Sequence, residues 1–477
     1  MALQYINGKC LPGKGEPVEI FNPATEDIVD SVQTATREQA IEALEAAQAA
    51  FPIWSSLSLE ERGDWICKLS DAILAEKGTI ADLLSREVGL PYSATPGEVA
   101  GVSKNLLFMY EEAKRVYGTT LPDYGAPQGE VYHFVQPYPL GVTVGHLAWN
   151  HPLHFFGAKL APALASGCTC VLKPSISTPL ASLYIAAIAE RIGFPRGVFN
   201  VLAGPSGVIG KALNESKIPR LIGVIGSSET GRQVMSQGAT SIKRYSLELG
   251  GNAPLIIMPD ASLDDAVSYI VQRKTDSCGQ GCSNINRVYV HRDVHDKVVE
   301  LLLEKLRRVK VGWGKDEADA MGPQINKERR NALLDLIDEA VKHGAKLLYG
   351  GKIPEGMHRG AFIMPTLLDE TPDDAVLTHL EIFGPVIPVY TFTELDDAIA
   401  RGNDTESGLA AYVYSHDSRV IAKCSEKLTF GMIYVNNPVF GGSNLPHIGV
   451  KESGIGCDYS RWSLENYYML RRTSMRP

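Results

Sequence analysis

One stretch of the sequence decides the fold class: Gly141-Val142-Thr143-Val144-Gly145-His146-Leu147. This short apolar run, rich in β-branched residues, predicts a buried strand. A helical pattern follows over residues 153–164, and the run Cys168-Thr169-Cys170-Val171-Leu172-Lys173 predicts a second buried strand. A strand, a helix and a strand at this spacing predict a parallel βαβ unit.

The same alternation extends on both sides of this unit. Strands are expected over residues 197–202 and 221–226, which predicts an α/β layer with ligands at the strand ends. Beyond residue 255 a further strand-helix series predicts a second α/β domain. The expected helices cover residues 35–50, 59–77, 180–192, 208–213, 260–271, 295–309 and 332–343, the first with Thr34 and Thr36 as candidate caps. Residues 131–135 and 466–471 read as isolated extended segments that could pair with the rest of the molecule or with another subunit.

Composition excludes several classes of protein. The 477 residues are enough for two or three domains, and 55 acidic against 46 basic residues give a net charge of −9 without a basic run, which disfavours nucleic acid as a partner. The start of the chain lacks a signal-like segment and no apolar run is long enough for a membrane helix, so we expect a cytoplasmic location and no membrane association. The eight cysteines contain no Cys-x-x-Cys pair, so neither a disulfide framework nor a metal site is predicted.

A cysteine turn carries the strongest chemical signal: Asp276-Ser277-Cys278-Gly279-Gln280-Gly281-Cys282-Ser283-Asn284-Ile285-Asn286-Arg287. A thiol in a Gly-rich, open turn before a strand is accessible to a carbonyl substrate and can act as a nucleophile. The alternative is an inert buried cysteine. From this segment alone, both interpretations stay open.

Two segments are candidates for binding phosphate. Gly226-Ser227-Ser228-Glu229-Thr230-Gly231 follows an apolar strand and could present backbone N–H groups at a helix N-terminus, or it could be a simple turn. Lys173 ends another strand of the series and could bind ribose or phosphate, or stay a solvated loop lysine. The sequence contains no Gly-x-Gly-x-x-Gly fingerprint and no P-loop.

A carboxylate and an amide complete the candidate chemistry. Glu248 lies between two leucines, and an apolar setting raises a carboxyl pKa and favours a general base, although a solvent-facing strand glutamate is the alternative. Asn150 follows a strand and precedes a helix, where its amide could stabilise an oxyanion or cap the helix.

Together these motifs resemble those of the aldehyde dehydrogenase superfamily over essentially the whole chain. The matching elements are Trp149-Asn150, Lys173-Pro174-Ser175, Gly226-Ser227 through Gly231, Leu247-Glu248-Leu249-Gly250-Gly251, Gly279-Gln280-Gly281-Cys282 with Arg287, Glu381-Ile382-Phe383-Gly384-Pro385, Asn436 and Gly449-Val450-Lys451-Glu452-Ser453-Gly454.

The resemblance implies an α/β fold of two Rossmann-like parallel-sheet domains plus a small β oligomerisation element. Residues 1–118 and 140–250 would form the dinucleotide-binding domain, residues 251–430 the catalytic domain and residues 431–456 an active-site loop region. Residues 119–139 and 457–477 would pair between subunits of a homodimer or homotetramer.

The resemblance also implies roles for individual residues in oxidising a small-molecule aldehyde with NAD or NADP. Cys282 would attack the aldehyde, Asn150 and the Cys282 backbone N–H would hold the oxyanion, Glu248 would activate a water to hydrolyse the thioester, and Lys159 would assist proton movement. Cys278 could form a disulfide with Cys282 under oxidation. The residues expected to hold the cofactor are Trp149, Lys173, Ser175, Gly226, Ser227, Gly231, Leu249, Glu381 and Phe383, and those expected to line the substrate channel are His151, Phe155, Phe156, Gly281, Phe440 and His447.

The sequence departs from the pattern of the superfamily at the cofactor and at the channel. Ile176 stands where many NAD-preferring members carry a ribose-binding glutamate, which leaves room for the 2′-phosphate of NADP. His151 replaces an aromatic residue, and His447 with Ile448 replaces a Phe-Gly pair. The two histidines could favour an oxygenated or anionic aldehyde, or stack as aromatic walls.

Three other classes are weighed against this interpretation. A CoA-acylating semialdehyde dehydrogenase would lack the glutamate at position 248. A cysteine hydrolase needs a histidine base near the thiol, and His291, the nearest histidine in sequence, follows a strand that would carry it away. A non-catalytic structural protein on the same fold would not need Cys282, Glu248 and Asn150 together.

Overall fold

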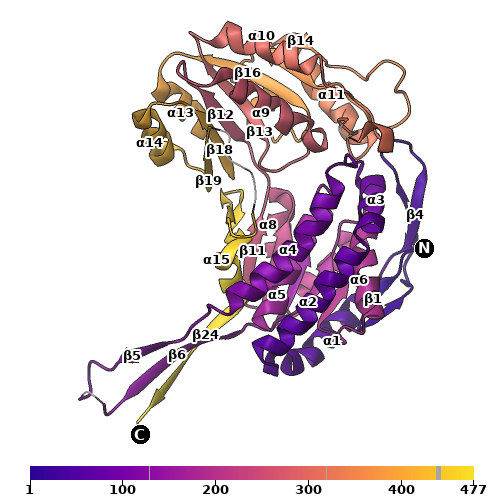
Figure 1. Cartoon of the computed structure of the whole chain (residues 1–477), viewed down its shortest axis with the longest axis vertical. Coiled ribbons are helices and arrows are strands. Elements are labelled where there is room, and N and C mark those ends of the chain that lie inside the picture. The colour runs from indigo at the N-terminus through magenta and orange to yellow at the C-terminus, as the bar shows by residue number, and fades with distance from the viewer. Residues whose placement is uncertain (128, 319, 437–441, 477) are drawn as a thin grey trace.

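The computed structural model describes residues 1–127, 129–318, 320–436 and 442–476. In these ranges the chain forms two lobes, each built around a twisted, mostly parallel sheet, and a thin arm that projects from one of them (Figure 1). None of the helices in the described part of the chain combines the length and apolarity that a membrane span requires.

The first sheet contains the predicted βαβ unit. Its strands, in spatial order, are β2 (Lys9–Leu11), β1 (Gln4–Ile6), β9 (Phe199–Val201), β8 (Thr169–Lys173), β7 (Val142–His146), β10 (Leu221–Ile225), β11 (Arg244–Glu248) and β22 (Gly454–Ile455). Strands β9 to β11 run parallel, while β1 and β22 are antiparallel to their neighbours at the two sides. The parallel centre is therefore closed on each side by a strand from a distant part of the chain.

Helices cover both faces of this sheet because its strands are apolar on both faces. In β8, Cys170 and Leu172 pack into one core while Val171 packs into the other, as the two-residue period of a strand requires. The helices of this lobe are α1 (Arg37–Ser56), α2 (Leu59–Ala75), α3 (Lys77–Val88), α4 (Thr95–Ala113), α5 (Pro152–Ser166), α6 (Leu180–Arg191), the π-helical turn η1 (Ser206–Gly210), α7 (Lys211–Glu215) and α8 (Ser228–Gly238). The candidate cap Thr36 does begin α1, in a capping box with Gln39.

The second sheet follows the same principle. Its spatial order is β14 (Lys346–Tyr349), β15 (Thr366–Asp369), β16 (Val386–Phe392), β13 (Ile285–His291), β12 (Ala253–Ile257), β18 (Ala410–Tyr414) and β19 (Met432–Val435), with β14 antiparallel to the rest. The helical segments of this lobe are α9 (Leu263–Thr275), η2 (Asp276–Gly279), α10 (His295–Leu306), η3 (Lys315–Glu317), α11 (Lys327–Lys342), α12 (Val376–His379), α13 (Leu395–Asn403) and α14 (Ser418–Lys427). The fold class of two Rossmann-like sheets is therefore confirmed.

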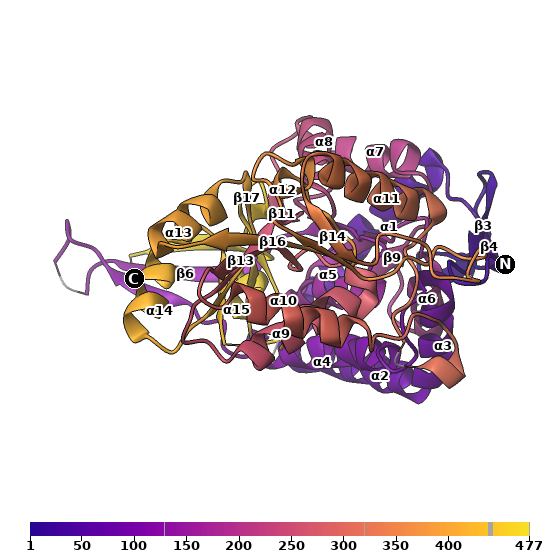
Figure 2. The ribbon, with the colours of Figure 1, turned by 90° about the horizontal axis from the view of Figure 1, so that it is seen from above.

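The two isolated extended segments pair with each other. β24 (Tyr468–Met475) runs antiparallel to β6 (Tyr132–Pro139), and β6 also pairs with β5 (Thr119–Pro122). Together they form the arm, which projects away from the β3–β4 hairpin (Pro17–Phe21 and Ile28–Gln33) at the opposite end of the molecule (Figures 1 and 2). The segment 457–477 also contributes β23 (Cys457–Asp458) and α15 (Ser460–Glu465) to the body. The predicted domain boundaries stay a prediction.

Short strands near the carboxyl end of the chain link the lobes. β20 (His447–Ile448) pairs with β23, and β21 (Val450–Lys451) pairs with β17 (Ser407–Gly408) of the second lobe. Since β22, a few residues further on, belongs to the first sheet, residues 447–458 pass from one lobe to the other. Within this passage, β22 pairs with Leu247 and Glu248, the last two residues of β11.

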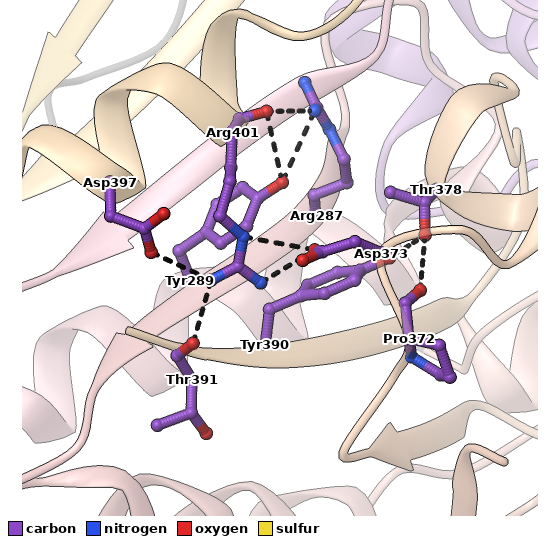
Figure 3. Close-up of polar contacts among 9 residues, drawn as sticks. All are labelled: Arg287, Tyr289, Pro372, Asp373, Thr378, Tyr390, Thr391, Asp397 and Arg401. Carbon is purple, nitrogen blue, oxygen red and sulfur yellow. Dashed lines mark hydrogen bonds and ion pairs between the residues drawn. The ribbon is translucent and has the colours of Figure 1, made fainter. Parts of the chain in front are cut away.

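Arg287 anchors the strand that follows the cysteine turn. Its fully buried guanidinium donates to the carbonyl oxygens of Asn252 at 2.8 Å, Gly402 at 2.8 Å and Arg401 at 2.9 Å. Arg401 in turn lies over the Tyr289 ring and pairs with Asp373 (Figure 3). Through these hydrogen bonds to three backbone carbonyl groups, Arg287 fixes the position of the first residues of strand β13, which follows the cysteine turn.

Candidate active site

The cysteine turn is held in a strained shape by side-chain amides. Ser277 and Cys278 have φ angles of 49° and 53°, a left-handed conformation that costs non-glycine residues about 1–3 kcal/mol each. Gln280 Nε2 donates to the Ser277 carbonyl oxygen at 2.8 Å, and Asn284 Nδ2 donates to the Gly279 carbonyl oxygen at 3.0 Å. These bonds turn the chain so that Cys282 faces the junction between the lobes.

Cys278 and Cys282 have different surroundings. Cys278 is fully buried in the apolar cluster that contains Met321 and Leu333, whereas Cys282 is partly exposed and packs beside the core of the second sheet. Both are free thiols. The sequence suggested that the two could form a disulfide under oxidation. In the structure they are unbonded and lie in different clusters.

Glu248 ends β11 of the first sheet and faces Cys282 across the junction. Its side chain is 5% exposed, and neither carboxylate oxygen has a hydrogen-bond partner among the described residues. Burial raises the pKa of Glu248 well above its ordinary value, with a further contribution from Asp458. Burial, followed by the Glu248 and Glu381 carboxyl groups, also raises the pKa of the Cys282 thiol. The pair therefore disfavours a state in which both groups are ionised.

Two glycines after Glu248 make this approach possible. A β-carbon on Gly251 would lie 2.3 Å from the carbonyl oxygen of Cys282, and one on Gly250 would lie 2.7 Å from Glu381 Oε2. Both distances are far below van der Waals contact. The two glycines of the Leu-Glu-Leu-Gly-Gly sequence thus allow the backbone that follows β11 to lie directly against the cysteine turn of the second lobe.

His447 completes a cluster with these two residues. Its Nε2 lies 3.9 Å from Cys282 Sγ and 3.4 Å from Glu248 Oε1. Burial lowers the pKa of His447 to about 4, so the imidazole is neutral near pH 7. The expectation that no histidine would lie near the thiol is therefore wrong. His291 is near in sequence, but β20 supplies His447 from 165 positions away.

Asn150 and Lys159 flank the cluster in different ways. Asn150 is 3% exposed, and its Nδ2 donates to the Gln280 carbonyl oxygen at 2.9 Å, which sets one of its two amide hydrogens beside the cysteine turn. Lys159 lies behind the cluster, with Nζ 2.6 Å from Asp458 Oδ1 and 3.5 Å from Ser246 Oγ. Both members of this ion pair are buried.

A cavity of about 520 Å³ opens on the first-lobe side of the cluster. It is lined by Trp149, Lys173, Ser175, Ile176, Gly226, Ser227, Leu249, Glu381 and Phe383, and it reaches Glu248 and Cys282. Phe383, with φ 52°, packs its ring edge-on against Trp149 at 5.5 Å. Among the residues predicted to hold the cofactor, Gly231 does not line the cavity, because it is buried within α8.

The donors in this cavity suit a dinucleotide. The N-terminus of α8, capped by Ser227, opens into it, and a helix N-terminus attracts phosphate. Burial lowers the pKa of Lys173 to about 8, which an anionic ligand would offset. At the end nearer to Cys282, the half-buried Glu381 carboxylate can accept hydrogen bonds from ribose hydroxyls. The cavity therefore fits NAD or NADP.

A second cavity, of about 660 Å³, opens on the other side of Cys282. Asn150, Phe155, Ile225, Glu248 and Cys282 line both cavities, so the thiol lies where they meet. The predicted channel residues His151, Phe155, Gly281 and His447 line it, while Phe156 is fully buried in the core and Phe440 lies outside the described residues.

Arg273 and Lys104 also line the second cavity and were not predicted from the sequence. Arg273 Nη2 lies 3.3 Å from the Oγ of Ser283, the residue after the thiol. His151 was expected to face the substrate, but its imidazole pairs with a protein carboxylate. Its Nδ1 lies 3.2 Å from the buried carboxylate of Glu98. The positive charge in the channel thus comes mainly from Arg273 and Lys104. The sequence feature that could have pointed to Arg273 is the adjacent basic pair Arg273-Lys274 at the end of α9.

Comparisons with known proteins agree over nearly the whole chain. A profile described as "Aldehyde dehydrogenase family" matches residues 11–473. The chain is 36% identical over 468 residues to a protein of Pseudomonas putida named glutarate-semialdehyde dehydrogenase, covering 98% of this chain and 96% of the relative. It is 36% identical over 467 residues to the Escherichia coli protein named succinate-semialdehyde dehydrogenase (NADP(+)) GabD, with the same coverage. The crystal structure of an NADP-dependent enzyme of E. coli superposes with a TM-score of 0.96 at 35% identity, over 100% of this chain and 98% of the other.

Breaking the buried ion pair should destabilise the protein. Lys159→Met leaves Asp458 as an uncompensated buried charge, which typically costs about 3–5 kcal/mol of unfolding free energy. Urea unfolding followed by circular dichroism measures this change. The matched control is Lys297→Met, which breaks the exposed pair with Glu300 and should cost less than about 1 kcal/mol. Equal losses in the two variants would contradict a structural role for the buried pair.

Proposed function

Since the chain belongs to the aldehyde dehydrogenase family and is an NAD(P)-dependent aldehyde dehydrogenase, we propose that its substrate is an aldehyde that carries a carboxylate at its far end. The observation that carries the proposal is Arg273, a cation in the wall of the cavity that leads to Cys282. Lys104 supports the same charge preference at an exposed position of that cavity. The names of both relatives also denote dicarboxylic acid semialdehydes.

In the proposed reaction, Cys282 forms a bond to the aldehyde carbon as its thiol proton leaves. The proton passes to solvent, which reaches the partly exposed Cys282. The Asn150 amide and the Cys282 backbone N–H stabilise the oxyanion, and donors of this kind typically contribute about 3 kcal/mol each. A nicotinamide cofactor, when bound, supplies the two-electron acceptor for the hydrogen on that carbon.

Glu248 acts when the acyl group is released. The carboxylate takes a proton from a water, which attacks the thioester carbonyl, and the Cys282 thiolate leaves. Because Glu248 is present at this position, hydrolysis is favoured over release to coenzyme A. The Lys159–Asp458 pair holds α5 against β23 behind the site and contributes fixed charge to it.

We further propose that the arm mediates homo-oligomer formation, as a dimer or a tetramer. The arm projects from the body (Figure 1) and carries exposed apolar side chains, since Leu470 in β24 is 75% exposed and Leu121 in β5 is 44% exposed. Sedimentation velocity before and after removal of residues 468–475 would test this assembly.

Glu248→Gln should separate the two halves of the reaction. The variant can still form the thioester but cannot activate water, so we expect at most one equivalent of NAD(P)H per site in a burst and a kcat about 10²- to 10⁴-fold lower. Stopped-flow absorbance measures both quantities. Cys282→Ser is the control and should give no burst.

The pH dependence of kcat provides a second readout of the same variant. The base form of Glu248 is populated above its pKa, which burial raises, so kcat should rise with pH through a range above that of ordinary carboxyl groups. Glu248→Gln should remove this rise. A wild-type deacylation rate that falls as pH rises from 5 to 8 would contradict the assignment.

Dual use of NAD and NADP is proposed from Ile176. This side chain lines the cofactor cavity without a negative charge, so it does not repel a 2′-phosphate. Ile176→Glu should lower kcat/KM for NADP at least about tenfold relative to NAD, which corresponds to about 1.4 kcal/mol. A wild-type preference for NAD above about a thousandfold, or about 4 kcal/mol, would reject dual use.

Arg273→Met tests the substrate class. Loss of a charge-assisted hydrogen bond of about 1.5–3 kcal/mol should lower kcat/KM for succinate semialdehyde about 10- to 150-fold. Because Arg273 also lies near the thiol, the measured quantity is the ratio to butanal, which lacks the carboxylate. His151→Phe, which removes the partner of Glu98 instead, should change this ratio less. An unchanged ratio in Arg273→Met would reject the anionic substrate.

A further inference from the structure

The cluster of Cys282, Glu248 and His447 has the composition of a metal site. One ligand atom from each residue lies within 4.8 Å of the other two. A thiolate, an imidazole and a carboxylate form the mixed sulfur, nitrogen and oxygen set that Zn²⁺ accepts. The proposed reaction requires Cys282 and Glu248 and gives no role to His447.

Two of the three separations are close to those around a tetrahedral zinc ion, and the third, between Cys282 Sγ and the Glu248 carboxylate, is within 4.8 Å. With Zn–S near 2.3 Å and Zn–N near 2.0 Å, a sulfur and a nitrogen ligand lie about 3.5 Å apart, and a nitrogen and an oxygen ligand about 3.3 Å apart. Here Sγ lies 3.9 Å from His447 Nε2, and Nε2 lies 3.4 Å from Glu248 Oε1. Movements of less than about 1 Å in the Cys282 and Glu248 side chains would therefore close the site.

The fold holds the nitrogen ligand in this position. His447 belongs to β20, and it pairs directly with Asp458 of β23, whose carboxylate is fixed by Lys159. Glu248 is in turn the last residue of β11, in register with Gly454 of β22. The two ligands thus come from neighbouring strand pairs and do not depend on a loose loop.

The polar atoms and charges also favour a cation. Both oxygens of the buried Glu248 carboxylate lack a hydrogen-bond partner among the described residues, which is a costly arrangement that a metal bond would relieve. One thiolate and one carboxylate balance the charge of a dication. The Arg273 guanidinium, which lines the same cavity, opposes the cation but is not part of the ligand set.

We propose that Cys282, Glu248 and His447 bind one Zn²⁺ ion, with the fourth coordination position open toward the substrate cavity. Binding deprotonates the thiol and releases its proton to solvent. Because the metal then occupies both the nucleophile and the general base, Zn²⁺ inhibits the enzyme reversibly. The metal site stands independently of the proposed substrate class.

The test is metal binding by the full-length protein after removal of metals with a chelator. Zinc retained after gel filtration should reach one ion per chain at micromolar free Zn²⁺, as measured by atomic absorption. Titration with Co²⁺ should give an absorption band from thiolate-to-cobalt charge transfer, together with the visible bands of tetrahedral cobalt. His447→Gln should weaken Zn²⁺ binding by more than about 100-fold, because it removes a direct ligand.

Matched controls separate the cluster from other thiols and imidazoles. Cys278→Ser alters the buried neighbouring cysteine, and His154→Gln alters another histidine of the same cavity, so both should retain one zinc per chain. Cys282→Ser should lose the charge-transfer band. If His447→Gln fails to give the wild-type circular dichroism spectrum, Glu248→Gln provides the same comparison at another ligand.

Three results would overturn the proposal. They are no zinc retained at micromolar concentration, zinc binding that is unchanged in both His447→Gln and Glu248→Gln, and a charge-transfer band that persists in Cys282→Ser. An activity assay provides an additional test, since Zn²⁺ should abolish NAD(P)H production and excess EDTA should restore it. A protein that lacks activity toward semialdehydes but binds zinc as described would reject only the substrate proposal.

Discussion

The active site depends on a backbone contact between two sheets. Gly251 lies so close to the carbonyl oxygen of Cys282 that no side chain fits between them. This contact brings the last residue of β11, Glu248, opposite a thiol that belongs to the other lobe. Nucleophile and base are thus on different sheets, and their separation is set by how the sheets meet. The strained turn at Ser277 and Cys278 and the hydrogen bonds of Arg287 serve the same purpose from the second lobe.

Burial of Glu248 and Cys282 prepares the site both for reaction with an aldehyde and for binding of a metal dication. Removing water raises the pKa of both Glu248 and Cys282, so the resting site disfavours carrying the two negative charges at once. An incoming aldehyde changes this balance because the charge moves to an oxyanion that amide donors can hold. A dication would change it too, since it stabilises both anions at once. The neutral His447 beside them makes this second outcome accessible.

The sequence was sufficient for the βαβ unit around β7 and β8 and for the motif residues, because both depend on local patterns, whereas α3 and α4 were not predicted. The alternation around β7 and β8 predicted a parallel sheet, and the segments around Glu248 and Cys282 were recognisable without any knowledge of their contacts. The surroundings of these residues were not predictable. His447 reaches Cys282 from 165 positions away, through the pairing of β20 with β23, and no spacing rule connects them. Arg273 could be seen at the end of a helix, but whether it faced solvent or the cavity depended on the rotation of α9. Phe440 lies outside the described residues.

The ion pair between Lys159 and Asp458 joins residues 299 positions apart, and this distance along the chain has a consequence for biosynthesis. At about 5–20 residues per second, roughly 15–60 s separate the emergence of the lysine from that of its partner on the ribosome. During this interval α5 can pack on the first sheet only with an ammonium group that has no counter-ion. The first lobe therefore reaches its final state only after the segment that carries Asp458 and β22 has been synthesised.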